Sequence, residues 1–220
     1  MKIYKWVLGP LETNCYLIVS GNEALLIDVG WHEDLDDLVN FLRNKSPRSI
    51  GVVATHGHFD HVAGVSVIKR LFHTLFMINR KDLVLLENSS RIAREFFEFE
   101  IPDPPKPDLF IQEKDVIRVG DIYIEVLEVP GHTPGSIALF IREDYSDIKK
   151  PILFTGDLLF RDSIGRVDFP ESSPSEMRES LEKILRLPEE TIILPGHGPE
   201  TTLAREIREN IVLREFLGDY

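Results

Sequence analysis

Five of the seven histidines lie in three short motifs, and this clustering constrains the fold of the 220-residue chain more than any other feature. The motifs are THGHFDH at 55–61, PGHTPGS at 130–136 and PGHG at 195–198, and each follows an apolar run typical of a buried strand. A fourth apolar run, ILFT, leads in the same way into Asp157. Loops at the carboxyl ends of strands in an α/β sheet can converge on one crevice, so we predict a single site built from four strand ends.

The rest of the hydrophobic pattern predicts an α/β domain in which helices cover sheets. Three β-rich runs open the chain, separated by Gly9-Pro10 and Gly21-Asn22, which is typical of an antiparallel meander. The predicted strands are 2–8, 14–20, 23–29, 50–55, 75–78, a hairpin over 116–129, 137–142, 152–156 and 191–196. The predicted helices are one beginning at Asp34, one containing Val62, Val65 and Ile68, a helical segment over 80–100, one over 175–187 and one beginning near Leu203.

An excess of acidic residues excludes some classes of partner. The 37 acidic and 25 basic side chains give a formal net charge of −12, whereas nucleic-acid affinity depends largely on Lys and Arg. We therefore expect no nucleic-acid partner. No apolar run approaches the roughly 18 to 20 residues of a membrane span, and the opening MKIYKWVLGP lacks the apolar block of a secretory signal. We expect a cytoplasmic protein without membrane association.

Cysteine usage limits the kind of metal site that the chain can build. Cys15 is the only cysteine, so the sequence offers no intrachain disulfide and no thiolate zinc site. We expect Cys15 to be a small core residue, because no motif histidine neighbours it in sequence. Any metal must then be held by histidine and carboxylate.

The residue types of THGHFDH suit metal binding. His56 and His58, two positions apart on a turning loop, can direct two imidazoles at one ion, while Asp60 and His61 can reach a second ion. Gly57 allows the backbone to turn tightly between the two histidines. An isolated motif of this kind is as often a solvated loop, but the two further Gly-His loops favour a metal site.

Other candidate residues carry weaker signals. Asp28 lies at the end of the predicted strand ALLIDV and can orient a metal-binding histidine through its free N–H, although a turn cap explains it nearly as well. Arg166 can bind an anionic group of a substrate, or it can pair with Asp168. His32 and His73 have no partners in sequence, so we expect surface or capping roles and leave them out of the site.

In their order along the chain, these elements resemble the metallo-β-lactamase superfamily. The HxHxDH, GHTPGS, GD and GH elements span 56–197, and NCYLI at 14–18 and LIDVG at 26–30 are similar to the family's N-terminal half. The resemblance implies an α/β fold, classed as α+β in some schemes, with a four-layer αββα sandwich and a site at one edge between two mixed sheets. It implies that residues 1–220 form a single domain of this kind.

Within the superfamily the chain is most similar to short glyoxalase II-like hydrolases, which cleave thioesters of the hydroxyacyl-glutathione kind. That similarity implies two divalent metal ions, zinc first, with iron or manganese as alternatives. It also implies two ligand sets and one shared carboxylate. The first set is His56, His58 and His132, the second is Asp60, His61 and His197, and the shared ligand is Asp157.

Two features depart from the long glyoxalase II pattern. Those enzymes carry a C-terminal helical domain that helps to hold glutathione, whereas 23 residues follow His197 here. Their loop after the shared carboxylate has a lysine and a tyrosine that contact the thiol cofactor, whereas this chain has Arg166 and Asp168 at those positions. The resulting GRxD pattern resembles both short bacterial glyoxalase II-like proteins and persulfide dioxygenases, and does not separate them.

As a hydrolase, the chain is expected to attack a small-molecule thioester with a metal-bound hydroxide, since metals lower the pKa of water from 15.7 to roughly 7. Asp157 and Asp60 are the expected catalytic carboxylates, and Asp157 orients the nucleophile and accepts its proton. The main alternative is a mononuclear iron persulfide dioxygenase that uses His56, His132 and Asp157. A lactonase uses the same metal chemistry, and the negative charge argues against a nuclease relative. The oligomeric state stays open.

Overall fold

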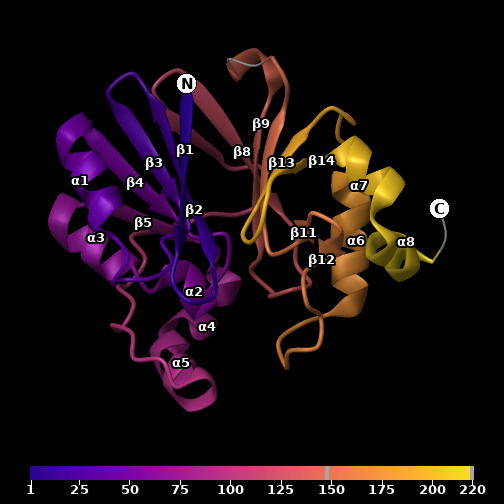
Figure 1. Cartoon of the computed structure of the whole chain (residues 1–220), viewed down its shortest axis with the longest axis horizontal. Helices are drawn as coiled ribbons and strands as arrows, with labels where there is room; N and C mark the ends of the chain where they lie inside the picture. Colours follow the sequence, from indigo (N-terminus) through magenta and orange to yellow (C-terminus); the bar gives the residue numbers. More distant parts are fainter. Residues whose placement is uncertain (147–148, 219–220) are drawn as a thin grey trace.

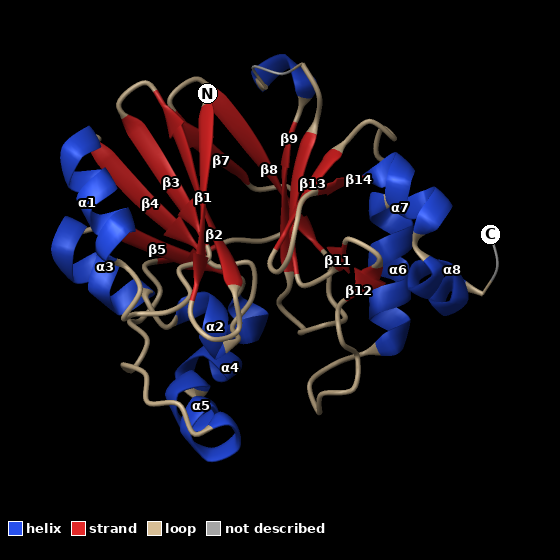
Figure 2. Ribbon diagram, viewed as in Figure 1, coloured by secondary structure: helices blue, strands red, loops and turns tan. Residues whose placement is uncertain are grey.

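Two six-stranded mixed sheets pack face to face, and helices cover their outer faces (Figures 1 and 2). This computed structural model describes residues 1–146 and 149–218. The four-layer αββα sandwich that the sequence predicted is confirmed. Among the described residues, every helix falls short of the length and apolarity that crossing a membrane requires.

The first sheet contains the N-terminal meander, and its strands follow one another in chain order. They are β1 (Lys2–Leu8), β2 (Thr13–Ser20), β3 (Glu23–Ile27), β4 (Ser49–Val53), β5 (Leu75–Ile78) and β6 (Leu109–Phe110). The first three strands are antiparallel, as predicted, and β3 to β6 are parallel. Strand β3 ends before the predicted position because Asp28 adopts a φ of +56°, which takes the backbone out of the β region.

The second sheet has the order β14-β13-β10-β9-β8-β7. Its strands are β7 (Val116–Val119), β8 (Ile122–Glu128), β9 (Ile137–Ile141), β10 (Ile152–Gly156), β13 (Ile192–Pro195) and β14 (Thr201–Thr202). The predicted hairpin is β7 and β8, and β10 pairs with β13 in parallel. A separate small hairpin joins β11 (Leu159–Phe160) and β12 (Ser163–Ile164). Because β10 and β13 are parallel, the loops that follow both strands leave the sheet at the same edge.

Helices of each half cover the sheet of that half (Figure 1). The helices over the first sheet are α1 (Asp36–Lys45) and α3 (Val65–Phe72), and those over the second are α6 (Pro174–Ile184), α7 (Leu203–Glu209) and α8 (Ile211–Leu217). Beyond the end of the first sheet lie α2 (Phe59–Val62), α4 (Leu83–Glu87) and α5 (Ser89–Phe97). Short 3-10 turns are η1 (Arg80–Asp82) and η2 (Glu143–Tyr145).

Three predicted helices are interrupted in the structure. The helix expected around Val62 and Val65 divides into α2 and α3 at Gly64, whose N–H donates to the Val29 carbonyl at 2.9 Å. A side chain at Gly64 would meet Val29 Cγ1 at 2.7 Å, so this break depends on close backbone approach. The segment over 80–100 divides into η1, α4 and α5. The last helix divides at Asn210, whose side chain accepts from the N–H of Leu213 and caps α8.

Alternation along the strands produces three apolar layers. Ile18 of β2 and Leu139 of β9 pack between the sheets, whereas Leu17 faces α1 and α3, and Phe140 faces the second helix layer. The inner strands β2, β3, β9 and β10 are therefore buried on both faces, which explains their continuous apolar runs. Cys15 is buried in the first helix–sheet layer, and burial raises the pKa of its thiol, which fits the expected core role.

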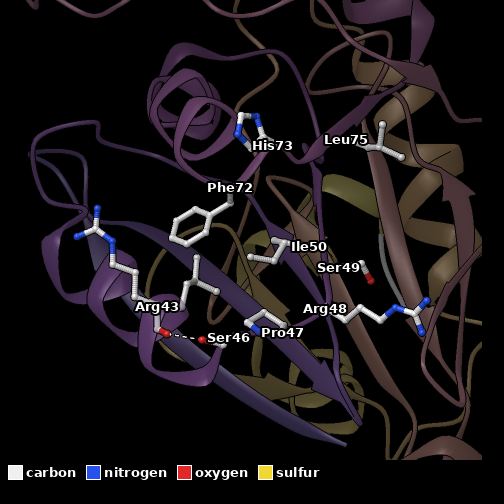
Figure 3. Close-up of a pocket in the computed structure, with 10 residues that line it drawn as sticks. Arg43, Ser46, Pro47, Arg48, Ser49, Ile50, Phe72, His73 and Leu75 are labelled. Atoms are coloured by element: carbon white, nitrogen blue, oxygen red, sulfur yellow. Dashed lines mark hydrogen bonds between the residues drawn. The ribbon is translucent and has the colours of Figure 1, made fainter.

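A cavity of about 490 Å³ lies at the start of β4 and β5, beside the carboxyl ends of α1 and α3. Figure 3 shows the guanidinium groups of Arg43 and Arg48 on opposite sides of it, pointing away from one another. The cavity therefore gathers no charged cluster. It also lies at the opposite end of β4 from the loop that carries the first histidine motif.

Replacing Phe154 tests the layer between the sheets. Phe154 is 1% exposed and its ring contacts Tyr16 edge-on at 5.2 Å. We expect Phe154→Ala to lower the free energy of unfolding by about 3 to 5 kcal/mol, because it removes buried apolar surface and leaves a cavity. Urea denaturation measures this change. Phe96→Ala, at a position 73% exposed, is the matched control and should change it by less than about 0.5 kcal/mol. A cost below about 1 kcal/mol at Phe154 contradicts this packing.

Candidate metal centre

The loops after β4, β8, β10 and β13 meet at one edge of the sandwich, as the sequence predicted. They bring together the side chains of all five motif histidines and two carboxylates. These are His56, His58, Asp60 and His61 from the first sheet's side, and His132, Asp157 and His197 from the second. The potential ligand atoms form groups within 4.8 Å of one another.

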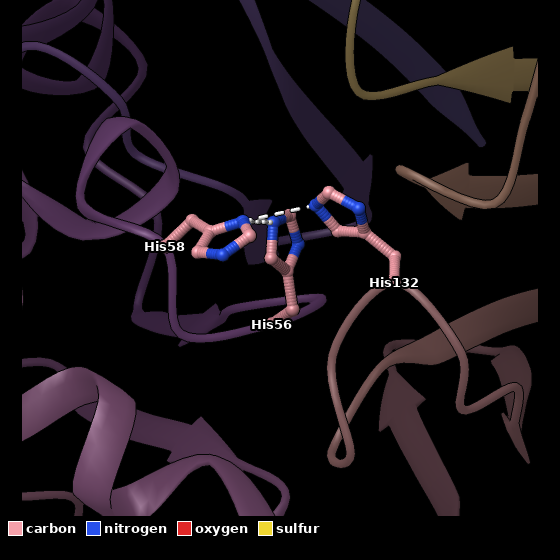
Figure 4. Close-up of side chains that lie close together, drawn as sticks. All are labelled: His56, His58 and His132. Carbon is pink, nitrogen blue, oxygen red and sulfur yellow. Dashed lines mark hydrogen bonds between the residues drawn. The ribbon is translucent and has the colours of Figure 1, made fainter. Parts of the chain in front are cut away.

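One group consists of three imidazole nitrogens (Figure 4). His58 Nδ1 lies 3.0 Å from His56 Nε2 and 2.9 Å from His132 Nε2. Nitrogens bound at 2.0–2.1 Å in a tetrahedral site are roughly 3.3 Å apart, so the three atoms are spaced as ligands of one ion. Figure 4 shows the three rings directed toward a common point from two separate loops.

A second group combines two imidazoles with a carboxylate. His61 Nε2 lies 3.3 Å from His197 Nε2 and 3.5 Å from Asp60 Oδ2. His197 Nε2 lies 3.2 Å from the same Asp60 oxygen. Nitrogen and oxygen ligands in this proportion suit zinc, manganese or iron rather than calcium.

The carboxylate of Asp157 lies between these two groups, and it forms a third group with His56 and His61. Its Oδ2 atom is 3.6 Å from His132 Nε2 of the first group and 3.5 Å from His197 Nε2 of the second. Its Oδ1 atom is buried without a hydrogen-bond partner among the described residues, although His61 Nε2 lies 3.4 Å away. A buried ionised oxygen is costly unless it is paired or bound to a cation, so this position fits a metal ligand.

Each of the five imidazoles also contacts an oxygen through its other ring nitrogen. The pairs are His56 Nδ1 with Thr55 Oγ1 at 3.1 Å, His58 Nε2 with Glu171 Oε1 at 3.0 Å, His61 Nδ1 with Asp28 Oδ2 at 2.9 Å, His132 Nδ1 with the Arg166 carbonyl at 2.9 Å, and His197 Nδ1 with the Leu11 carbonyl at 2.9 Å. An N–H that donates outward leaves a lone pair on the inner nitrogen. This pattern is typical of metal-binding histidines.

The bonds of Asp28 differ from those of a local turn cap. Its carboxylate accepts from the N–H of Thr55 at 2.7 Å and from the Thr55 hydroxyl at 2.8 Å, and Thr55 lies 27 positions further along the chain. The same carboxylate lies 2.9 Å from His61 Nδ1. Because the Thr55 hydroxyl donates to Asp28, its oxygen is available to accept from His56. The left-handed backbone of Asp28 is uncommon for a non-glycine residue and occurs here beside the candidate site.

Burial and charge separate the protonation states of the group. Burial, reinforced by neighbouring imidazoles, lowers the pKa of His56, and burial also lowers the pKa of His132. Burial opposes the charged form of His61, but the carboxylates of Asp60 and Asp157 outweigh it and raise its pKa. Burial likewise opposes ionisation of Asp157, yet His61 lowers its pKa to about 2. Burial also opposes the ionisation of Asp60, but His61 lowers its pKa. Both carboxylates are therefore ionised at neutral pH, which favours cation binding.

Asp82 is a buried residue of the site region that sequence reasoning missed. Its Oδ2 atom accepts from the Gly57 N–H at 2.8 Å and from the Thr133 hydroxyl at 2.7 Å, and its Oδ1 accepts from the Gly135 N–H at 2.6 Å. Asp82 therefore ties the THGHFDH loop to the PGHTPGS loop. A side chain at Gly135 would meet the Asp82 carboxylate at 2.6 Å, so glycine is required for this approach.

Two further residues outside the histidine motifs contact ligand side chains. Glu171 accepts from His58, as described above, and the Thr13 hydroxyl donates to Asp60 Oδ2 at 3.0 Å. No sequence signal marked either residue, because each lies far along the chain from its partner.

Arg166, His73 and His32 are the remaining residues that the sequence analysis considered. The guanidinium of Arg166 donates from Nε and Nη2 to Asp168 at 2.8 Å each, and it is exposed. Contact between Arg166 and a substrate stays a prediction. His73 ends α3 in a left-handed conformation, and neither it nor His32 belongs to a ligand group within the described residues.

A family model with the description Metallo-beta-lactamase superfamily matches residues 8–197. The chain belongs to the metallo-beta-lactamase superfamily. Among superfamily relatives, the hydroxyacylglutathione hydrolase GloC of Haemophilus influenzae is 34% identical and aligns with 90% of this chain and 92% of its own. The probable metallo-hydrolase YqgX of Bacillus subtilis is 27% identical, over 98% of this chain and 99% of its own.

Solved structures of the superfamily match nearly the whole chain. BLEG-1, a B3 metallo-beta-lactamase, has a TM-score of 0.85 at 29% identity and covers 96% of this chain and 99% of its own. TTHA1623 in a di-iron-bound form has a TM-score of 0.81 at 35% identity and covers 94% of this chain and 98% of its own. ETHE1 from Myxococcus xanthus has a TM-score of 0.77 at 25% identity and covers 99% of this chain and 88% of its own.

The tie made by Asp82 can be tested with Asp82→Asn. An amide cannot accept all three donors, so we expect a loss of about 2 to 4 kcal/mol in the free energy of unfolding of chelator-treated protein, measured with urea. Asp103→Asn is the matched control, because Asp103 is exposed and accepts one bond, from Ser90. Equal stability of Asp82→Asn and the control contradicts the tie.

Proposed function

We propose that the chain is a binuclear metal-dependent hydrolase that cleaves thioesters of the hydroxyacyl-glutathione type. Its membership of a metallo-hydrolase superfamily is shown by the family match and the relatives. The observation that carries the binuclear proposal is the pair of ligand groups with Asp157 between them. The likeness to a hydroxyacylglutathione hydrolase over nearly the whole chain supports the thioester substrate.

The donor set fits two divalent cations. In the proposed site His56, His58 and His132 hold one ion, the second group holds the other, and Asp157 contributes to both. When bound, such ions supply a water of lowered pKa and positive charge beside the reacting carbonyl. We propose zinc first, with iron or manganese as alternatives. The di-iron-bound form of TTHA1623 supports iron as an alternative.

The chain's own residues then orient the reaction. Asp157 is ionised, so its carboxylate can accept a hydrogen bond from the attacking water and take its proton. Asp60, the second proposed catalytic carboxylate, is fixed by the Thr13 hydroxyl. The side chains of His197 and His58 are 27% and 14% exposed, whereas His61 is fully buried, so substrate approaches from the side of His58 and His197. A thiolate is a good leaving group and needs little help from an acid.

A persulfide dioxygenase is the second candidate, and the likeness to ETHE1 from Myxococcus xanthus favours it. That proposal uses His56, His132 and Asp157 for a single iron. The ligand group of Asp60, His61 and His197 supports the binuclear hydrolase instead, because a single-metal site does not require it. Two measurements separate the reactions. Thiol release from S-lactoylglutathione supports the hydrolase, and oxygen uptake with glutathione persulfide supports the dioxygenase.

Removing the shared carboxylate should abolish either reaction. We expect Asp157→Ala to lower kcat/KM for the best thioester by more than a hundredfold, because both ligand groups lose a donor and the nucleophile loses its orienting group. Steady-state thiol release measures this loss. Asp121→Ala, on the exposed β7–β8 turn, is the control and should leave kcat/KM unchanged. Retention of more than about a tenth of the activity, under 1.4 kcal/mol of transition-state stabilisation, means that Asp157 is misassigned.

His197 separates the binuclear hydrolase from the mononuclear oxygenase. We expect His197→Ala to reduce the metal content of protein loaded with zinc from about two ions to about one per chain, and to reduce thiol release. Elemental analysis after gel filtration measures the content. His73→Asn, which keeps a residue that tolerates the left-handed end of α3, is the control. Unchanged metal content together with robust oxygen consumption contradicts the binuclear proposal.

A further inference from the structure

The loop between β12 and α6 places the ring of Phe169 against two histidines of the first ligand group. The ring centroid of Phe169 lies 5.3 Å from that of His58 and 5.7 Å from that of His132, edge-on in both cases. The loop is held in place at both ends of this contact. The Arg166 carbonyl accepts from His132 Nδ1, and the Ser172 hydroxyl donates to the His132 carbonyl at 2.7 Å.

The guanidinium of Arg166, which is paired with Asp168, covers one face of the Phe169 ring. The guanidinium carbon of Arg166 lies 4.3 Å from the Phe169 ring centroid, and two bonds of 2.8 Å join the guanidinium to Asp168. This stack fixes the orientation of the ring, and the pairing leaves no net charge on the loop at that point. The other acidic side chain of this loop, Glu171, is bonded to His58.

Phe169 also stands at the open side of the centre. His58, which it contacts, is one of the two more exposed histidines, and Phe169 itself is partly exposed. On the other open side, the Phe160 ring lies 6.1 Å from the ring of His197. A substrate that reaches the ligand groups therefore passes aromatic surface on both sides, with no unpaired cation of this loop beside Phe169.

We propose that Phe169 is the specificity-determining wall of the site, and that it receives an apolar acyl group next to the scissile bond. This inference rests on the proposed thioester hydrolysis and narrows its substrate class to thioesters with an aliphatic or aromatic acyl chain. Phe169 acts by contact with the acyl chain, whereas the Arg166–Asp168 pair acts by positioning the ring. An acyl chain carrying a carboxylate would instead meet Glu171 and a cation that is already paired.

The test uses acetate and hexanoate, which share a carboxylate and differ only in the length of an apolar chain. Their dissociation constants for zinc-loaded protein are measured by titration calorimetry, so the result does not depend on turnover. We expect hexanoate to bind wild type about tenfold more tightly than acetate, since burial of the added methylenes is favourable. Phe169→Ala should bind hexanoate no more tightly than acetate, while its affinity for acetate and its zinc content stay as in wild type. Phe169→Leu should keep most of the preference for hexanoate over acetate.

Phe96→Ala, on exposed α5, is the matched control and should behave as wild type. Equal affinities of the two acids for wild type, or a preference that survives Phe169→Ala, overturn the proposal. If Phe169→Ala loses affinity for acetate and hexanoate equally, the ring has a structural role, and the proposal is overturned as well. Failure of thioester hydrolysis itself is seen separately, as absent thiol release from wild type, and leaves the chain-length preference measurable.

Discussion

Five imidazole rings can direct one nitrogen each at a common centre only if their other nitrogens find hydrogen-bond acceptors. Four of the rings meet this requirement with hydrogen bonds to Thr55, Glu171 and the main-chain carbonyls of Leu11 and Arg166. The fifth, His61, has its Nδ1 atom 2.9 Å from the Asp28 carboxylate. Much of the local architecture follows from that requirement. The early end of β3, the left-handed Asp28 and the loop before α6 all place an oxygen behind a histidine.

The sequence predicted the parts of the fold that depend on local pattern. β-rich runs separated by turn residues located the meander and the β7–β8 hairpin, and helical spacing of apolar residues located α6. The helix breaks at Gly64 and Asn210 were missed, since each depends on a tertiary contact or a cap rather than on spacing. The convergence of the histidine loops could be predicted because each motif follows a strand.

The supporting residues could not be predicted in the same way. Asp82 lies 53 positions from Gly135, and Glu171 lies 113 positions from His58. An acidic residue in a helical segment or a surface loop has many ordinary explanations, and only the folded chain shows which one applies. The pairing of Arg166 with Asp168 is different, because the two residues lie two positions apart and the sequence itself indicates this pair as one of two roles for Arg166.

The potential ligand side chains come from both halves of the sandwich, so metal binding would also affect the stability of the fold. His56, His58, Asp60 and His61 follow β4 of one sheet, whereas His132, Asp157 and His197 follow strands of the other. An ion that binds both sets is a cross-link between the two halves of the sandwich. Because such an ion binds the folded chain and not the unfolded chain, it would stabilise the fold by its free energy of binding. Ions held at the proposed centre would thus also hold the two halves of the sandwich together, in a chain whose lone cysteine cannot form an internal disulfide.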